Sequence, residues 1–282
     1  MALGQVCDDH AIMTVADYFR RVSYSGPTEP TLEVLQALVA AHNRSIPFEN
    51  LDPLIGIPVY DLTPDALEDK LIHRLRGGYC FEHNGLFTHV LTQLGFGVEP
   101  LGGRVVWMTD SDELPAQTHM TLAVTVPGVE GRYLVDVGFG GQTLSSPIRL
   151  EVGTVQQTRH EPYRIREHGD RLVLESEIRG KWEPLYLFTD KPFPVIDRRV
   201  GSWYVSTYPG SHFVYGLTVA LVTDEARFNL RGRNLAIHRR DGSERIRLDN
   251  AAQVVEELTG RFGIDLTGLG DVEARVSQVL DS

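Results

Sequence analysis

Apolar residues recur at the spacing of amphipathic helices in the first third of the chain. The first such stretch follows Thr31, a residue type that favours helix N-caps. The second follows Thr63-Pro64-Asp65, which provides an N-cap, a proline at the first helical position and an acidic first turn. The third ends at Gly95, a residue type typical just after a helix C-terminus. The pattern predicts a helical segment over residues 1–95, with its apolar faces at Leu32, Leu35, Leu38 and Val39, at Leu67, Leu71, Ile72 and Leu75, and at Leu86, Phe87, Val90, Leu91 and Leu94.

The pattern changes near residue 96 to short segments rich in Val, Leu and Thr, which are typical of β-strands. Residues 191–194 are proline-rich and predict a connection between elements. We therefore expect an antiparallel β segment over residues 96–200, with strands at 103–107, 119–126, 132–137, 163–167, 171–177 and 183–189.

Residues 201–282 predict a smaller mixed segment, in which strands precede helices. The whole chain thus reads as a helical segment, an antiparallel β segment and a mixed segment, which is an α+β organisation. The elements expected in the last segment are a strand over 213–223, a hairpin of 234–239 with 244–248 around Asp241-Gly242, and helices after Asn250 and from about Asp271.

The composition excludes several classes of function. The 282 residues are 42% hydrophobic and 23% charged, which is ordinary for a soluble globular protein of two or three domains. The formal net charge is −11, and an acidic chain repels phosphate backbones, which argues against nucleic-acid binding. No apolar run is long enough for a transmembrane helix, and the N-terminus lacks the basic region of a secretory signal. Cys7 and Cys80 cannot build a disulfide framework, which indicates a reducing compartment. Together these features lead us to expect a cytoplasmic protein that binds no membrane.

Cys80 is the first candidate for chemistry. Gly77 and Gly78 allow a sharp backbone turn before it, and Cys80 opens the third predicted helix. The unpaired N–H groups and partial positive charge of a helix N-terminus favour a thiolate, which is the nucleophilic form of cysteine. Arg76 lies four residues upstream and could add positive charge. The alternative is a buried structural cysteine, and we interpret Cys7 as incidental.

A cysteine nucleophile requires a base, and His119 is better placed than His83. His83 lies one turn after Cys80, where its ring would project along the helix surface. His119 starts an apolar strand after a polar loop, a position that holds a side chain rigidly and keeps it accessible. Asp136 lies in the next strand, and an acid within an apolar strand must be paired. If the two strands pair antiparallel, Asp136 lies near His119 and can orient its ring; the alternatives are a satisfied histidine and a turn-capping aspartate.

Two other kinds of site would use some of the same residues. Cys80, His83, His119 and Asp136 are donor types that suit zinc, but a second close pair of ligands, which makes a zinc motif specific, is missing. Residues 138–142 are glycine-rich and permit close approach of the backbone to a ligand, although they match no phosphate-binding or dinucleotide-binding motif. The sequence therefore predicts no metal site.

Four short motifs resemble those of one enzyme family. Residues 76–84, Arg-Gly-Gly-Tyr-Cys-Phe-Glu-His-Asn, resemble the active-site signature of the arylamine N-acetyltransferases. Residues 46–50, the strand start at 119–122 and the segment 135–140 resemble further motifs of that family, in family order and at family spacing. The resemblance covers essentially the whole chain and is most specific between the first and the last of these motifs.

The resemblance implies a fold. That fold is α+β, with an N-terminal helical bundle over 1–95, a central antiparallel β-barrel-like domain over 96–200 and a C-terminal α/β lid over 201–282. The bundle would carry the nucleophile, and the β-barrel-like domain would carry a histidine and an aspartate. Together these would form a cysteine-protease-like Cys-His-Asp core.

The resemblance also implies a function. Cys80, His119 and Asp136 would form a catalytic triad, in which Cys80 takes acetyl from acetyl-CoA and passes it to an arylamine, arylhydrazine or hydrazide by a ping-pong mechanism. Acetyl-CoA is then a co-substrate, and no cofactor is permanently bound. The implied partners are small molecules only, and the chain is expected to be a monomer or a homodimer.

The resemblance also implies roles for residues around the triad. Arg76 and Glu49 are implied to form an ion pair that supports the turn before Cys80. The implied acceptor pocket consists of Phe48, Val105, Phe139, His212 and Phe213, and the implied acetyl-CoA contacts are Gly140, Gly141, Thr207 and His212.

Three other functions stay open on the sequence. An amide synthase that closes a polyketide chain would use the same triad with a carrier-bound acyl donor. A cysteine hydrolase would resolve the acyl-enzyme with water in place of an amine. A non-enzymatic binding module would leave Cys80 with ordinary thiol reactivity.

Overall fold

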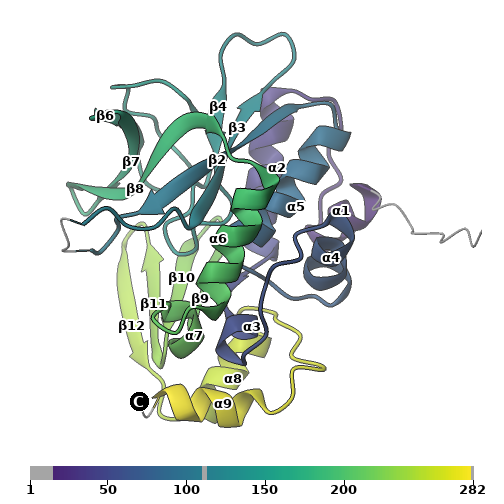
Figure 1. Cartoon of the computed structure of the whole chain (residues 1–282), viewed down its shortest axis with the longest axis vertical. Coiled ribbons are helices and arrows are strands. Elements are labelled where there is room, and N and C mark those ends of the chain that lie inside the picture. Colours follow the sequence, from purple (N-terminus) through teal and green to yellow (C-terminus); the bar gives the residue numbers. More distant parts are fainter. Residues whose placement is uncertain (1–14, 110–112, 281–282) are drawn as a thin grey trace, which may run out of the picture.

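The computed structural model describes residues 15–109 and 113–280. Figure 1 shows helices on one side of the molecule, an antiparallel sheet beside them, and a second sheet with the last helices below. Cys7, which we interpret as incidental, lies outside the described residues.

The N-terminal part is helical, as the apolar spacing predicts. Thr31 caps its helix, since its hydroxyl oxygen accepts from the Val34 N–H at 3.3 Å. The predicted second helix is divided, because a π-helical turn follows its first five residues directly. The elements are α1 (Val15–Arg21), α2 (Leu32–Ser45), α3 (Leu51–Leu54), α4 (Pro64–Glu68), the π-helix η1 (Asp69–His73) and α5 (Cys80–Gln93).

The central sheet is antiparallel throughout and has the strand order β5-β4-β3-β2-β8-β7-β6. Its seven strands curl into a barrel-like sheet, as predicted. The first strand starts earlier than the predicted 103–107, because residues 97–102 pair with β3 although they include glycines and a proline. The strands are β2 (Gly97–Val105), β3 (His119–Thr125), β4 (Tyr133–Val135), β5 (Ile148–Arg149), β6 (Tyr163–His168), β7 (Arg171–Ile178) and β8 (Lys181–Pro192).

The C-terminal part is a second antiparallel sheet, in the order β1-β9-β10-β11-β12, with two helices packed on one face. The predicted hairpin and both predicted helices are confirmed. One edge strand comes from the N-terminal part, since Phe48 pairs with Ala220. The elements are β1 (Phe48–Glu49), β9 (Thr218–Val222), β10 (Ala226–Arg231), β11 (Asn234–Arg239), β12 (Gly242–Arg247), α8 (Ala251–Gly260) and α9 (Val272–Leu280).

The connection predicted at 191–194 is shorter than expected, because β8 runs to Pro192 and helix α6 (Val195–Thr207), which the sequence did not predict, follows directly. Its buried positions include the small residues Gly201 and Ser202, whereas Ile196 and Trp203 are exposed. The helix therefore has no inward apolar stripe, which is the signal that periodicity detects. It also runs across residue 200, where the predicted second segment ends.

The strand predicted over 213–223 is also partly wrong. Its first residues form the short helix α7 (His212–Tyr215), and the strand β9 begins only at Thr218. Ser211 caps α7, since its hydroxyl oxygen accepts from the Phe213 N–H at 3.3 Å. The β-branched and aromatic residues in this stretch favour a strand, and the local cap overrides that preference.

Buried apolar side chains form three clusters. The first joins the helices to the inner strands, the second lies between the C-terminal sheet and its helices, and the third lies within the central sheet. Cys80 belongs to the first cluster, and Phe139 packs on the third. The residues of chemical interest therefore lie where the helical and β parts meet.

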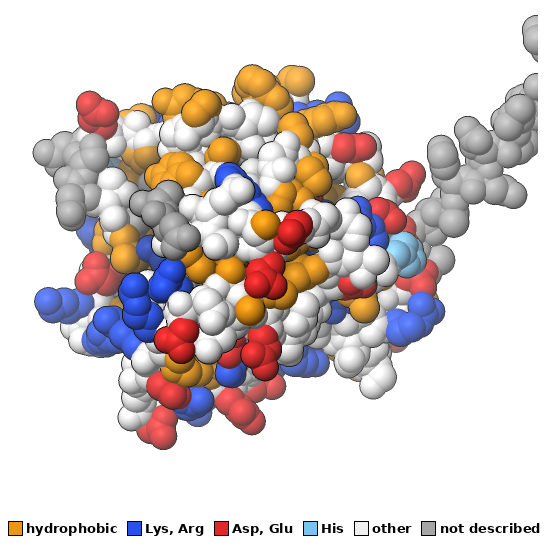
Figure 2. Space-filling view, turned by 90° about the horizontal axis from the view of Figure 1, so that it is seen from below, with side chains coloured by type: hydrophobic (Ala, Val, Ile, Leu, Met, Phe, Trp, Pro, Cys, Tyr) orange, Lys and Arg blue, Asp and Glu red, His pale blue; other side chains and the backbone are white. Residues whose placement is uncertain are grey.

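The described residues contain no helix that is both long and apolar enough to cross a membrane. Acidic and basic side chains are interspersed on the face shown in Figure 2, and Lys and Arg side chains gather at its left. The excess of acidic residues in the whole chain therefore coexists with locally basic surface.

Candidate active site

Cys80 is the first residue of α5, and two glycines shape the turn that precedes it. A side chain at Gly77 would collide with neighbouring backbone, and one at Gly78 would collide with the Glu82 carboxylate. The Cys80 side chain is 6% exposed, and its Sγ lies 3.5 Å from the carbonyl oxygen of Thr118. The thiol thus lies at a helix N-terminus, where the partial positive charge favours an anion.

His119 and Asp136 lie together at one end of the β3–β4 hairpin. The two strands pair antiparallel, with Leu122 opposite Val135. His119 Nε2 lies 2.6 Å from Asp136 Oδ2, and both side chains are buried. Nδ1 is therefore the ring nitrogen left for a second partner, and Cys80 lies close enough to the ring to raise the pKa of His119. The structure thus brings together the three residues that the sequence suggests as a triad.

The surroundings of His119 favour its imidazolium form. Burial by itself would lower the pKa of His119, but the carboxylate of Asp136 and the adjacent Cys80 outweigh burial and raise this pKa to about 10. An imidazolium next to a thiol stabilises the thiolate, because opposite charges attract strongly in a low-dielectric site. The arrangement can therefore hold Cys80 and His119 as a thiolate–imidazolium pair.

Asn84 is a member of this site that sequence reasoning missed. It lies four residues after Cys80 and hence on the same face of α5. Its Nδ2 donates to Asp136 Oδ1 at 3.0 Å and to the Met120 carbonyl at 2.7 Å. Its Oδ1 accepts from the Val137 N–H at 3.1 Å. The side-chain amide of Asn84 thus links α5 to both strands of the β3–β4 hairpin. Its spacing of four residues from Cys80 is the sequence signal that could have identified it.

The segment after Asp136 passes directly over the nucleophile. The Gly138 N–H donates to Asp136 Oδ1 at 3.0 Å, and a Cβ on Gly138 would lie 2.8 Å from the Cα of Cys80. Gly140 has a φ of +79°, and a Cβ there would lie 3.3 Å from the ring of Phe48. Gly138 is thus required by close approach and Gly140 by its left-handed backbone.

Aromatic rings surround the triad. Phe139 meets the His119 ring edge-on, with centroids 5.2 Å apart. Phe48 and Phe213 meet edge-on at 5.9 Å, and Phe213 lies 5.4 Å from the ring of Tyr79, the residue before the nucleophile. Three of the residues predicted for the acceptor pocket therefore lie around the triad.

The other two predicted pocket residues are less central. Val105 lies on β2 opposite Tyr186, whose ring centroid is 4.6 Å from that of His119. His212 lies on α7 and is exposed, and its Nε2 is 3.2 Å from Thr218 Oγ1.

His83, the rejected base, is committed to a different contact. Its Nδ1 lies 2.8 Å from His42 Nε2, and its Nε2 lies 3.1 Å from the carbonyl oxygen of Pro47. His42 Nδ1 in turn lies 3.0 Å from the hydroxyl of Tyr18. This buried chain ties α5 to α2 and α1 and leaves neither ring nitrogen of His83 for Cys80.

These two histidines predict a specific acid sensitivity. Burial is the main cause that lowers the pKa of His83 to about 4 and the pKa of His42 well below 6.5. As the pH falls below 6.5, the unfolded chain takes up protons that the folded chain excludes. The free energy of unfolding then falls by up to about 1.4 kcal/mol per pH unit and histidine. Between about pH 7.5 and about pH 5, the free energy of unfolding of His83→Gln should fall by about 1–2 kcal/mol less than that of the parent. Urea unfolding at the two pH values measures this difference. Equal losses in the two proteins would contradict this source of acid sensitivity.

A group of buried charges lies behind the turn that leads to the nucleophile. Arg76 Nε donates to Glu49 Oε1 at 2.9 Å, and its Nη2 donates to Asp52 Oδ1 at 2.8 Å. Lys70 Nζ lies 2.7 Å from Asp52 Oδ2 and 2.6 Å from Glu82 Oε1. Burial would lower the pKa of Arg76, but the two carboxylates outweigh it and raise that pKa. The Arg76 charge thus faces carboxylates and holds the turn, and it is not directed at the thiol.

The residues predicted to contact acetyl-CoA lie in two different parts of the structure. Gly140 and Gly141 lie in the segment over the nucleophile. Thr207 donates its hydroxyl to the Trp203 carbonyl within α6, at 2.6 Å, and His212 lies on α7. Within residues 15–109 and 113–280, no group of three or more His, Cys, Asp or Glu side chains is arranged to hold a metal ion.

Arg231 is a basic residue near the site that sequence reasoning missed. Its guanidinium carbon lies 6.0 Å from the Trp107 ring centroid, and that ring lies 5.8 Å from Phe139. Burial and then the charge of Arg231 lower the pKa of His212. In the described part of the chain Arg231 forms no ion pair, so its charge is available to an anionic ligand.

Comparison with known proteins identifies what the chain resembles. A family model described as N-acetyltransferase matches residues 31–270. An arylamine N-acetyltransferase from Mycolicibacterium smegmatis is 64% identical over 273 residues, which cover 96% of this chain and 99% of the relative. One from Mycobacterium tuberculosis is 56% identical and covers 93% and 94%. The structure of the Mycobacterium marinum arylamine N-acetyltransferase in complex with CoA is 56% identical, with a TM-score of 0.92 and coverage of 94% and 99%.

Proposed function

This chain belongs to the arylamine N-acetyltransferase family of acyltransferases, and we propose that it transfers acetyl from acetyl-CoA to arylamines, arylhydrazines and hydrazides through an acetyl-Cys80 intermediate. The complex of the Mycobacterium marinum relative with CoA supports acetyl-CoA as the donor. One observation carries the mechanism, namely the 2.6 Å contact of His119 Nε2 with Asp136, which leaves Nδ1 for the nearby Cys80.

In the first half-reaction the Cys80 thiolate attacks the thioester carbonyl of acetyl-CoA. A carbon–sulfur bond forms to Cys80, and the carbonyl electrons move to oxygen. The backbone N–H of Cys80, at the first position of α5, is the proposed donor to this oxyanion. Collapse breaks the bond to the CoA sulfur, and His119 gives its proton to the leaving thiolate. Acetyl-Cys80, neutral His119 and the CoA thiol result.

In the second half-reaction the acceptor nitrogen attacks acetyl-Cys80. His119 accepts the proton from this nitrogen, and collapse expels the Cys80 thiolate, which restores the thiolate–imidazolium pair. The attack requires an unprotonated lone pair. Arylamines and hydrazides are largely neutral near pH 7, whereas alkylamines are protonated, which explains the acceptor class.

The aromatic rings supply an acceptor pocket. Phe48, Phe139 and Phe213 present apolar surface within ring-contact distance of the triad or of its neighbours. A flat aromatic amine suits such a lining, because ring faces and edges pack favourably. Val105 and His212 are proposed to complete the pocket.

Arg231 is the proposed contact for the phosphates of the donor. We expect Arg231→Gln to raise the KM for acetyl-CoA about 3- to 10-fold, since an exposed guanidinium–phosphate contact is partly screened by solvent. The KM for p-nitrophenyl acetate, an acetyl donor without phosphates, should stay unchanged. Steady-state kinetics with both donors provide the comparison.

Arg239→Gln is the matched control. Arg239 lies opposite Ala226 at the far end of the same sheet, whereas Arg231 lies opposite Thr218. The control should leave both KM values at the parent level. A rise in the acetyl-CoA KM of equal size in both variants would argue for an unspecific charge effect and against an Arg231 contact.

Initial rates over a grid of acetyl-CoA and anisidine concentrations test the proposed function. Parallel lines in double-reciprocal plots are expected, because acetyl-Cys80 separates the two half-reactions. Intersecting lines would contradict the intermediate. CoA release at the full rate without acceptor would indicate a cysteine hydrolase. Turnover with a carrier-bound acyl chain but not with acetyl-CoA would indicate an amide synthase.

A further inference from the structure

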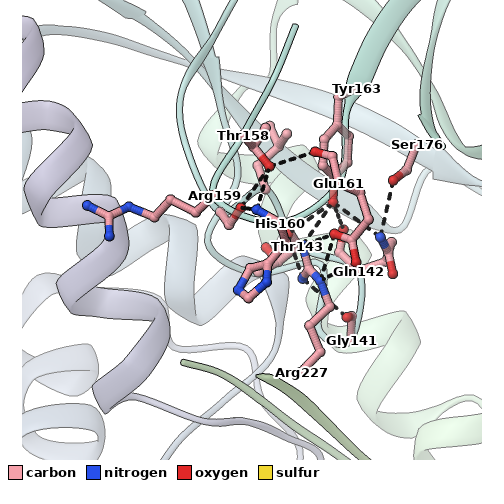
Figure 3. A network of polar contacts seen from close by, with 12 residues as sticks. Gly141, Gln142, Thr143, Thr158, Arg159, His160, Glu161, Tyr163, Ser176 and Arg227 are labelled. Atoms are coloured by element: carbon pink, nitrogen blue, oxygen red, sulfur yellow. Dashed lines mark hydrogen bonds and ion pairs between the residues drawn. The ribbon is translucent and has the colours of Figure 1, made fainter. Parts of the chain in front are cut away.

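A buried arginine of the C-terminal sheet holds the loop that carries the catalytic aspartate. Arg227 lies on β10 and is 1% exposed. Its Nη1 donates to the carbonyl oxygen of Thr143 at 3.0 Å and to that of Gly141 at 3.3 Å (Figure 3). These carbonyls belong to the residues 136–143, which we call the Asp136 loop.

The guanidinium is itself held on its other side. Arg227 Nε donates to Glu161 Oε2 at 2.9 Å, and its Nη2 lies 2.7 Å from the same oxygen (Figure 3). Nη2 also donates to the hydroxyl oxygen of Tyr163 at 3.3 Å. That hydroxyl donates to the carbonyl oxygen of Gln142 at 3.0 Å. The carbonyl oxygens of Gly141, Gln142 and Thr143 thus all accept hydrogen bonds from the buried side chains of Arg227 and Tyr163.

The contact with Thr143 extends to the triad. Thr143 Oγ1 donates to the backbone carbonyl of Asp136 at 2.6 Å and accepts from the Phe139 N–H at 3.2 Å. Phe139 packs edge-on against the His119 ring, and the Asp136 carboxylate binds that ring. A shift of Thr143 would therefore move both groups that orient His119.

An arginine is suited to this position in a way that other side chains are not. Its planar fork offers five N–H donors in fixed directions, so one group can bind two carbonyls, a carboxylate and a hydroxyl at once. Lysine offers a single point charge, and an apolar residue would leave buried carbonyls without donors. A purely structural link between the two sheets would not require hydrogen bonds from the Arg227 guanidinium to the Asp136 loop.

We propose that Arg227, held by Glu161, is a positioning residue for acyl transfer, which fixes the Asp136 loop so that Asp136 and Phe139 orient the His119 ring toward Cys80. This inference rests on the proposed function for its catalytic meaning. The orientation itself can be measured without acetyl transfer, because the pH dependence of Cys80 alkylation reports the thiolate–imidazolium pair. The titratable groups that face the His119 ring are Asp136, Cys80 and the Tyr186 phenol.

The test compares Arg227→Met, Arg227→Lys and Glu161→Gln with the parent. Iodoacetamide alkylation of Cys80 is followed as a function of pH, and acetylation of Cys80 by acetyl-CoA is followed in single turnovers. For Arg227→Met we expect acetylation to slow about 10- to 100-fold, since small displacements of catalytic groups are costly. The alkylation midpoint should rise by about one pH unit, because a poorly held imidazolium stabilises the thiolate less. Arg227→Lys and Glu161→Gln keep part of the network and should show smaller changes in the same direction.

Leu258→Ala is the control for general destabilisation. Leu258 is fully buried on α8 under the other face of the same sheet, and its truncation should lower stability by about 2–5 kcal/mol. It should leave the alkylation midpoint at the parent value. An unchanged midpoint in all three network variants, or an equal shift in Leu258→Ala, would overturn the positioning role. Failure of acetyl-CoA to acetylate the parent would refute the proposed function alone, since the alkylation profiles would still decide on Arg227.

Discussion

Replacing Cys80 with alanine is expected to reduce acetyl transfer by about 10⁴-fold or more, because in the proposed mechanism the acetyl group is carried as a thioester on the Cys80 sulfur. Cys80 interacts with His119 and lies at the N-terminus of α5. Its side chain is small, so its truncation should change the free energy of unfolding by about 1 kcal/mol or less. Acetylation of anisidine and urea unfolding measure the two effects.

Cys80→Ser separates nucleophilicity from shape. The hydroxyl fills nearly the same space but is not ionised near neutral pH, so this variant should also be inactive and fold like the parent. Transfer activity above a few per cent in both variants would show that the acetyl group passes by another route. An unfolded Cys80→Ala chain with a folded, active Cys80→Ser chain would likewise contradict the nucleophile assignment.

Replacing Asp136 with asparagine should lower transfer by about 10³- to 10⁴-fold, as expected when the orienting acid of such a triad is lost. Asp136 Oδ2 accepts from His119 Nε2 at 2.6 Å. An amide nitrogen in that position would favour the tautomer with its proton on Nδ1, and that nitrogen could then not take a proton from the Cys80 thiol. Single-turnover acetylation should therefore fail before any acceptor is added.

The same substitution should also lower stability. Asp136 is fully buried and accepts from Asn84, Gly138 and His119, so loss of its charge should cost about 2–3 kcal/mol. The His119 pKa is raised from 6.5 to about 10, so the stability that this charge pair contributes is present below pH 6.5 and is lost as the pH rises toward 10. Urea unfolding of Asp136→Asn should therefore depend less on pH in this window than that of the parent.

Asp190→Asn is the control for this prediction. Asp190 forms an ion pair with Arg132 at the surface, with both side chains substantially exposed, and it should affect neither activity nor the pH dependence. Full activity of Asp136→Asn, with the unfolding midpoint of the parent, would show that Asp136 does not orient His119.

The sequence predicted the elements that combine a periodic pattern with local start and stop signals. The α5 helix is an example, since the glycine turn before Cys80 marks its start and Gly95 marks its end. Gly95 has a φ of +91°, as is typical of a glycine just after a helix. The β3–β4 hairpin is another, since apolar strands joined by Pro127-Gly128 place His119 and Asp136 at one end. In both cases the signals lie within the element itself and in the turns that flank or join its parts.

The sequence could not predict contacts that depend on how distant segments pack. Arg227 is about 85 residues from the carbonyls it binds, and no local pattern links β10 to the Asp136 loop. Arg231 comes near Trp107 only because the C-terminal sheet folds back on the central one. The α6 helix was missed because small polar residues face the core and apolar ones face solvent, the reverse of the usual arrangement.

The acetyl-Cys80 intermediate is tested most directly by the intact mass of the protein after incubation with acetyl-CoA and no acceptor, followed by peptide mapping. We expect one added acetyl group, located on the peptide that contains Cys80, and its removal when anisidine or a hydrazide is added. We also expect release of one CoA per chain in the same incubation. Acetyl on a different residue, or turnover of acetyl-CoA and anisidine with no acetylated Cys80 even after rapid quenching, would contradict the intermediate.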